Sequence, residues 1–255
     1  MHRSRSTPRL AAALLLASSC AAPQTQSGPG ISAGVTRETL DFAIEWRLIP
    51  AGAAKFVWTG TPASSQVELK LSSGGLVSRL FRVDDDYTAT LRENLCAQST
   101  TLISHEGARN RDTRVTFDAA ARKAGSLEQD LDKNTTSAHE VEIPPCVHDV
   151  VGALMVLRRM ALEPGKSAQI PVSDGKKFVQ VKVESQRREE IRTSRGLRKT
   201  IRYEAFLFDN ILFRRSGHLH IWLTDDENHL PVQLQVKMNL AIGTITLRLE
   251  KEGKI

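Results

Sequence analysis

Apolar and polar residues alternate along most of the chain, and this period of two is typical of β-strands that bury one face. The clearest case puts Leu40, Phe42, Ile44 and Trp46 on one face of a strand. A turn is expected at 49–52, after which Ala54, Phe56 and Trp58 continue the alternation, as do Val67, Leu69 and Leu71. Further short strands are expected over 83–92, 100–106 and 114–118, whereas the polar segment 123–140 is expected to be a loop with at most one edge strand.

One segment has helical spacing instead. Between 149 and 162, the apolar residues recur at the three- and four-residue intervals of an amphipathic helix; they are Val150, Val151, Leu154, Leu157 and Ala161. Asp149 is a suitable N-cap, and Pro164-Gly165 ends the segment. This is the one helix that the pattern predicts.

The last third of the chain returns to short alternating segments separated by turns. Many strands with a turn about every ten residues indicate a sandwich, a barrel or a curved sheet. The predicted fold is mainly β: an antiparallel meander that forms a curved sheet or partly open barrel, with one central amphipathic helix capping its concave side.

The first residues resemble a bacterial lipoprotein signal. Arg3, Arg5 and Arg9 precede an apolar block over 10–17, which is too short to span a bilayer, and then Ser18-Ser19-Cys20. We expect a signal peptide at 1–19, a lipid anchor on Cys20, a flexible tether at 20–36 and a single β-rich domain at 37–255. Ala17 stands where such signals usually have leucine, and ordinary cleavage near residue 21 or 22 is the alternative.

This signal predicts export to the cell envelope. Ala21 after the cysteine resembles sorting to the outer membrane, so the periplasmic side of that membrane is the expected location. Without Arg3, Arg5 and Arg9, the 35 basic residues fall to 32 against 29 acidic ones, and this mild charge does not call for nucleic acid. In an oxidising compartment Cys96 and Cys146 are expected to form a disulfide, with two separately buried thiols as the alternative.

Several motifs support a family resemblance. The run from Gly217 to Asp226 (GHLHIWLTDD), Leu230-Pro231-Val232 and the segment 242–247 resemble the C-terminal signature of the bacterial domain of unknown function 3108. The run from Cys146 to Leu154 resembles the segment before that family's central helix, although Met155-Val156 stand where aromatic residues are expected. The resemblance covers about residues 38–250 and implies an exported, β-rich protein with no activity to transfer.

The densest basic region lies between 187 and 215. On hairpin strands it would form a face able to bind phosphate-bearing headgroups or anionic polymers. The candidate anion-binding residues are Arg192, Arg195, Arg198, Lys199 and Arg202. The alternative is a solvated strand face with cross-strand ion pairs.

Other chemistry-bearing residues have simpler explanations. His218, His220 and His229 could supply zinc ligands, but exposed polar residues on a strand explain them as well. Asp84-Asp85-Asp86 and Asp225-Asp226 lack the spacing of a calcium loop and fit turns. His148-Asp149 beside Cys146 fits helix capping next to a disulfide. We therefore expect no catalytic residue, no metal and no cofactor.

The function most consistent with these patterns is non-enzymatic binding of a lipid-like or amphiphilic ligand by an envelope lipoprotein. An envelope scaffold or protein-interaction module is the alternative, and a metal-dependent hydrolase using the three histidines is a third hypothesis.

Overall fold

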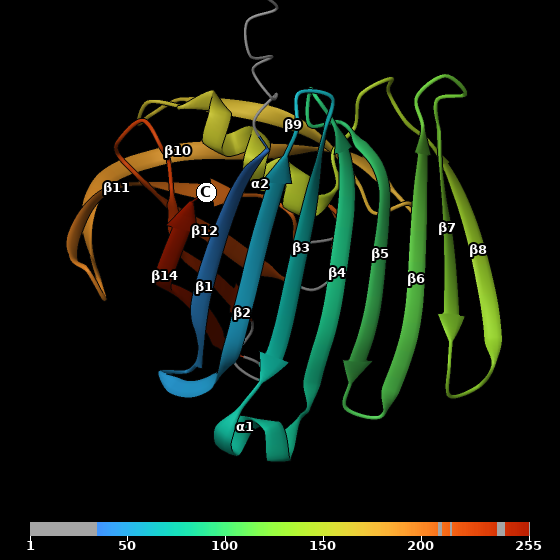
Figure 1. Cartoon of the computed structure of the whole chain (residues 1–255), viewed down its shortest axis with the longest axis horizontal. Helices are drawn as coiled ribbons and strands as arrows, with labels where there is room; N and C mark the ends of the chain where they lie inside the picture. The colour runs from blue at the N-terminus through green and yellow to red at the C-terminus, as the bar shows by residue number, and fades with distance from the viewer. Residues whose placement is uncertain (1–34, 209–210, 215, 239–242, 255) are drawn as a thin grey trace, which may run out of the picture. The chain divides into compact units, whose positions relative to one another are not determined.

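The alternating segments assemble into one antiparallel sheet. The computed structural model describes residues 35–208, 211–214, 216–238 and 243–254, and within them the sheet has 14 strands (Figure 1). The strands are β1 (Thr36–Trp46), β2 (Ile49–Gly60), β3 (Ser64–Ser73), β4 (Val83–Arg92), β5 (Ala97–Glu106), β6 (Arg109–Asp118), β7 (Lys123–Asp130), β8 (Thr135–Glu142), β9 (Ser167–Ser173), β10 (Phe178–Thr193), β11 (Gly196–Ala205), β12 (Gly217–Thr224), β13 (Pro231–Met238) and β14 (Thr244–Lys254). Two helices occur in the same residues, α1 (Gly75–Leu80) and α2 (Val150–Met160).

The sheet is a meander that does not close. Its strand order is β8-β7-β6-β5-β4-β3-β2-β1-β14-β13-β12-β11-β10-β9, so β8 and β9 are the two edges. Pairing of β1 with β14, for example Phe42 with Leu249, joins the two arms of the sheet. The arm β1–β8 faces the viewer in Figure 1, and the arm β14–β9 curls behind it. This confirms the predicted antiparallel meander.

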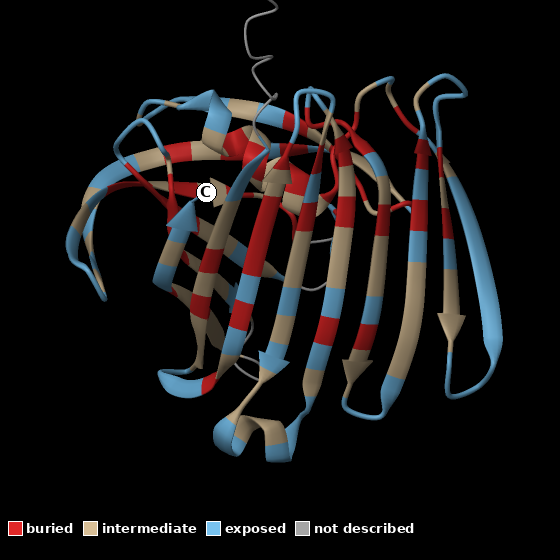
Figure 2. Cartoon of the chain, viewed as in Figure 1, coloured by how far each residue is buried: buried red, intermediate tan, exposed pale blue. Residues whose placement is uncertain are grey.

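The concave face of the sheet holds the core. Leu40 and Phe42 of β1 are buried on this face, as the alternation predicts. One cluster of buried apolar residues covers mainly the arm β1–β8 and another covers the arm β14–β9 (Figure 2). Helix α2 lies between the arms and contributes Met155 to the first cluster and Leu157 to the second. The helix therefore takes the central, concave position that the sequence predicts.

The first hairpin turns earlier than expected. Arg47 and Leu48 form its tip with positive φ angles of 50° and 70°, and β2 already begins at Ile49. Gly52 pairs with Ile44, directly before the register shift that places Glu45 opposite Pro50. A Cβ atom at Gly52 would lie 2.0 Å from the Ser72 carbonyl oxygen, so the glycine permits the close approach of β2 and β3.

Two predictions about secondary structure were wrong. The segment expected to be a loop, 123–140, forms most of the strands β7 and β8. Nearly every residue of β8 is exposed, so this edge strand lacks the apolar alternation by which strands are recognised. Helix α1 was not expected, because its six residues are too few to show a helical period and none of them is buried.

No helix in the described residues is long and apolar enough to cross a membrane. The predicted signal peptide, Cys20 and nearly all of the tether lie outside the described residues.

Candidate ligand-binding cavity

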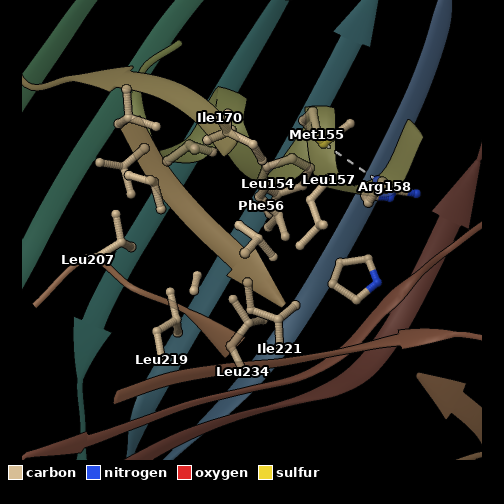
Figure 3. A pocket seen from close by; sticks show the side chains of 18 of the residues that line it. Phe56, Leu154, Met155, Leu157, Arg158, Ile170, Leu207, Leu219, Ile221 and Leu234 are labelled. Atoms are coloured by element: carbon tan, nitrogen blue, oxygen red, sulfur yellow. Dashed lines mark hydrogen bonds between the residues drawn. The ribbon is translucent and has the colours of Figure 1, made fainter. Parts of the chain in front are cut away.

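An apolar cavity lies between α2 and the concave face of the sheet. Its volume is about 160 Å³, and its walls come from both arms of the sheet and from the underside of the helix (Figure 3). Phe56 of β2, Leu154 of α2 and Ile221 of β12 represent these three sources. The cavity has one charged lining residue, Arg158, at the end of α2. A dry cavity of this size accommodates a group about as large as benzene, which matches a short stretch of acyl chain.

The apolar lining continues toward the end of the sheet where α1 lies. Along β1, Phe42 lines the cavity and Ile44, the next inward residue, lines a second hollow of about 470 Å³. The strands β3 and β14 show the same order: Leu69 and Leu247 line the cavity, and the next inward residues, Leu71 and Ile245, line the second hollow. A third hollow of about 810 Å³ shares Phe81 and Ile245 with the second. The concave face thus carries a row of apolar side chains from the cavity under α2 to the second hollow; we call this row the apolar path, although the cavity and that hollow share no lining residue.

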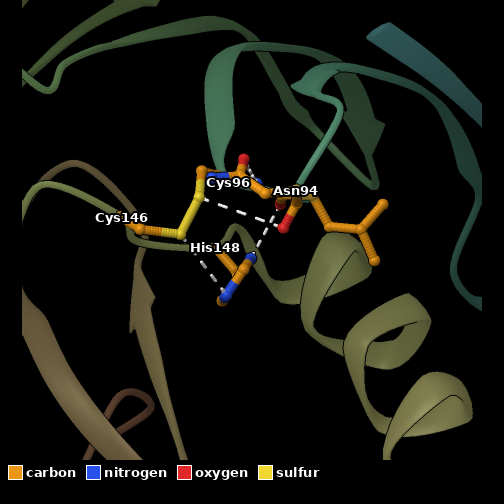
Figure 4. Close-up of a disulfide and its surroundings, with 5 residues drawn as sticks. Asn94, Cys96, Cys146 and His148 are labelled. Atoms are coloured by element: carbon orange, nitrogen blue, oxygen red, sulfur yellow. Dashed lines mark hydrogen bonds between the residues drawn. A yellow bond between two sulfur atoms is a disulfide. The ribbon is translucent and has the colours of Figure 1, made fainter. Parts of the chain in front are cut away.

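A disulfide fixes the segment that leads into α2. Cys96, directly before β5, is bonded to Cys146, with their Cα atoms 5.1 Å apart (Figure 4). His148 Nδ1 donates to the Leu95 carbonyl oxygen at 2.7 Å, and the His148 amide donates to the Pro171 carbonyl of β9 at 2.9 Å. The predicted disulfide is present and connects the segment before α2 to the arm β1–β8, and the His148 amide connects the same segment to β9 in the other arm.

Asp149 caps α2 as predicted and also binds the sheet. Its Oδ2 accepts from the amides of Val151 and Gly152 at 2.9 and 3.0 Å and from the Tyr87 hydroxyl of β4 at 2.6 Å. Burial, together with the negative charge of Asp149, raises the pKa of Tyr87 well above its usual range. The tyrosine therefore remains a neutral donor that holds the helix start against β4.

Arg158 holds the other end of α2. Its guanidinium donates to both carboxylate oxygens of Glu38 at 2.6 and 3.0 Å, and to the backbone carbonyls of His229 and Asn228 at 3.0 and 3.2 Å. The side chains of Arg158 and Glu38 are only 10% and 16% exposed. This bidentate ion pair joins α2 to β1, and the bonds to the two carbonyls join it to the β12–β13 turn. Both ends of α2, which covers the cavity, are therefore fixed.

A polar hollow of about 300 Å³ borders the apolar cavity. It shares Val150 and Val151 with that cavity and lies over the concave side of β4–β7. Its polar lining includes Tyr87, Thr100, Ser104, Arg111, Thr113, Glu128, Asp149, Ser173, Asp174 and Lys176. Lys176 Nζ donates to Glu128 at 2.7 Å, and this hydrogen bond lowers the pKa of Glu128. An amphiphile could place its polar group here and its apolar part in the cavity.

The predicted anion-binding residues are largely engaged in contacts within the protein. Arg195 and Arg198 both bind Glu252 of β14, at 2.6 and 3.3 Å, and Arg202 donates to the Gln186 side chain at 2.6 Å. Arg192 and Lys199 are exposed and make no ion pair within the described residues. Neighbouring Arg188 is also paired, with Glu163 and Asp225. This arrangement favours the alternative of an ion-paired strand face.

The three histidines do not converge. His218 and His220 lie on the face of β12 opposite Ile221, beside Glu204, and His218 Nδ1 is 2.8 Å from this carboxylate. His220 is largely covered, and burial lowers its pKa although Glu204 opposes the shift. The His229 carbonyl instead binds Arg158. Among the described residues, no group of histidine, cysteine and acidic side chains has the geometry of a metal site.

The remaining candidates have structural roles. Asp85 accepts from the His105 amide, and burial raises the pKa of this carboxyl group. Asp226 accepts from the Asn228 amide and the Thr224 hydroxyl in the β12–β13 turn. His148 and Asp149 hold the start of the helix, beside a cysteine that the disulfide occupies.

The sequence did not single out the cavity residues as a site. Their alternation marks them as inward-facing, but a filled core gives the same pattern. Nor does the sequence mark Tyr87, because only the fold brings it to Asp149. The polar inward residues of β5 and β6, such as Ser104 and Thr113, were an available signal, since a fully packed core rarely tolerates them.

The fold and the cavity together define a barrel-like protein with an unclosed sheet and a helix-covered apolar interior. The model of the family "Protein of unknown function (DUF3108)" matches residues 41–250, and the chain belongs to this family. Among solved structures, a β-barrel-like DUF1849 protein from Brucella abortus is similar, with a TM-score of 0.58 at 9% identity over 86% of this chain and 98% of that one. A Bacteroides fragilis protein with a YmcC-like fold matches with a TM-score of 0.30 at 12% identity, over 86% and 95% of the two chains. No curated protein matches significantly. At such identities the likeness of the DUF1849 protein concerns the fold alone.

Proposed function

We propose that the protein is an exported cell-envelope lipoprotein whose β domain binds a lipid-like, amphiphilic ligand on its concave face. The observation that carries this proposal is the apolar path from the 160 Å³ cavity under α2 to the open hollow of about 470 Å³. Ligand sites are typically apolar concavities with a few polar groups at one place, and the bordering polar hollow supplies those groups.

The proposed location in the cell envelope rests on observations other than the cavity. The sequence of residues 1–20 has the order of a lipoprotein signal, with Cys20 as the acceptor of the anchor. The Cys96–Cys146 disulfide in the folded part is typical of an oxidising compartment. Loss of acyl labelling and of membrane association in Cys20→Ser would support the anchor, whereas unchanged labelling would contradict it.

Ligand binding is tested by filling the path. Ala153 on α2 lines the cavity and Ala51 on β2 lines the open hollow. The substitutions Ala153→Phe and Ala51→Phe should each weaken binding of the fluorescent fatty acid cis-parinaric acid by at least about tenfold. Ala43→Phe is the matched control, because Ala43 lies on the other face of β1 between the inward residues Phe42 and Ile44.

Two outcomes would contradict the proposal. One is that the parent protein does not bind the probe. The other is that both cavity variants, folded as judged by circular dichroism, bind it as tightly as Ala43→Phe does.

A second candidate function is a protein-interaction module, and the edge strand β8 favours it. This strand pairs only with β7 among the described strands, and its residues Thr135–Glu142 are nearly all exposed. Such an edge can accept a strand from another protein. A photo-cross-linker at Ser137 in intact cells should capture a specific envelope protein under this hypothesis, and no specific adduct would count against it.

A further inference from the structure

The end of the sheet away from α2 carries a group of exposed apolar side chains. We call this group the mouth rim; it consists of Leu48, Ile49, Leu76, Leu80, Phe81 and Phe213. Leu48, Leu80 and Leu76 are 82%, 68% and 59% exposed. They come from the tip of the β1–β2 hairpin and from α1, which lie together at the bottom of Figure 1, whereas α2 lies at the top. Large apolar side chains this exposed and this close together mark an interaction surface.

The rim surrounds the open hollows. Leu80 and Phe81 line the hollow of about 470 Å³, and Phe81 and Phe213 line the hollow of about 810 Å³. The Phe81 ring also lies against Gly107 in the β5–β6 turn, where a Cβ atom would be 2.8 Å from it. Segments far apart in the sequence therefore form one continuous border around the mouth.

The charges at this border are mostly positive. Arg79, Arg109 and Arg214 are exposed and make no ion pair within the described parts of the chain. The nearby acids are paired instead, Asp84 with Arg82 at 3.3 Å and Glu106 with Arg111 at 3.6 Å. Apolar side chains at loop tips beside unpaired arginines suit a bilayer surface with anionic lipids, because the tips enter the interfacial layer and the arginines bind phosphate groups.

We propose that the mouth rim docks on a membrane that contains anionic phospholipid, with the two hollows that the rim lines facing the bilayer. The inference is independent of the lipid anchor on Cys20 and of ligand binding in the cavity. It identifies a surface different from the basic strand face of β10 and β11, where most arginines are paired.

The test is vesicle co-sedimentation of the full chain, with Cys20→Ser in every variant so that no acyl anchor contributes. The parent should bind vesicles of phosphatidylglycerol and phosphatidylethanolamine, bind phosphatidylcholine vesicles weakly, and lose binding as salt rises. Leu48→Ser with Leu76→Ser should lower binding to the anionic vesicles by at least about tenfold. Arg79→Gln with Arg109→Gln should also weaken it and reduce the salt dependence.

Matched controls lie far from the mouth, on β10 and β11. Leu197→Ser removes an apolar side chain that is 57% exposed, and Arg192→Gln with Lys199→Gln removes two exposed charges. Both controls should bind like the parent. Hydrogen exchange on the vesicles should show protection at 47–49 and 75–82 and none at 194–197.

The proposal is overturned if the rim variants bind like the parent, or if the control charges matter as much as the rim charges. A dimer that protects the rim without vesicles would also overturn it and would identify a second copy as the occupant. Leu48→Ser with Leu76→Ser should still bind cis-parinaric acid, because neither side chain lines the cavity or the hollows, so failure of docking and failure of the cavity proposal are separate results.

Discussion

The most specific structural prediction concerns Arg158, which joins α2 to both arms of the sheet. In Arg158→Met the long apolar stem is preserved, but the guanidinium is lost with its four hydrogen bonds to oxygen atoms and its contact with the Met155 sulfur. Glu38, only 16% exposed, then loses its ion-pair partner, and two backbone carbonyls lose their donor. Breaking a buried ion pair of this kind lowers the free energy of unfolding by about 3–5 kcal/mol. Because both side chains keep some exposure to solvent, we expect a loss near the lower end of this range, at about 3 kcal/mol.

The assay is equilibrium unfolding in urea, with the disulfide kept oxidised. In a parallel thermal melt, a loss of about 3 kcal/mol in a domain of this size should lower Tm by roughly 6–12 °C. Glu38→Gln should cost less, and the double variant should be more stable than additivity predicts, with a coupling energy of about 2 kcal/mol. Arg248→Met is the control: its pair with Glu45 is 40% and 28% exposed, so its loss should cost less than about 1 kcal/mol. The reasoning is refuted if Arg158→Met costs no more than Arg248→Met.

The other predictions concern three separate features. Replacing both Cys96 and Cys146 with serine should lower the free energy of unfolding by up to about 4 kcal/mol for the 50-residue separation, and an unchanged urea midpoint would contradict the structural role of the bridge. Burial lowers the pKa of His220, so the unfolded chain takes up a proton below about pH 6.5 before the folded protein does, and stability should fall as the pH drops from 7 to 5. His220→Gln should flatten this decline in urea titrations at each pH, and an equal effect of the exposed control His218→Gln would count against the explanation. Gly52→Ala should lower the free energy of unfolding by about 2 kcal/mol or more, because the new Cβ would meet the Ser72 carbonyl. The control Gly253→Ala, with open space around it, should change this free energy by less than about 0.5 kcal/mol. Equal urea midpoints for the two variants would show that β2 and β3 can separate freely.

The sequence predicted those parts of the fold that rest on local patterns. The inward residues of β1, the helix with its Asp149 cap and the disulfide each follow from alternation, helical spacing or compartment. Strand β8 and helix α1 could not be found in this way, because exposed elements carry no apolar period. The two arms meet through β1 and β14, which lie at opposite ends of the described domain, and no local pattern encodes that pairing.

Local sequence patterns are equally limited in predicting the candidate sites. The basic residues of β10 and β11 form a cluster in the sequence, but their partners Glu252, Asp225 and Glu163 come from other segments, so their neutralisation depends on the fold. The cavity likewise depends on the separation that α2 keeps between the two arms. Residues that line a void and residues that fill a core have the same alternation, and only their packing in three dimensions distinguishes them.

The most direct test of the central claim is native mass spectrometry of the protein extracted from its own membranes. The account predicts a mass excess that disappears on denaturation and corresponds to an amphiphilic molecule, and a smaller bound fraction in Ala153→Phe than in Ala43→Phe. A polypeptide that carries nothing except a covalent acyl group on Cys20, in the parent and in both variants, would contradict ligand binding in the cavity.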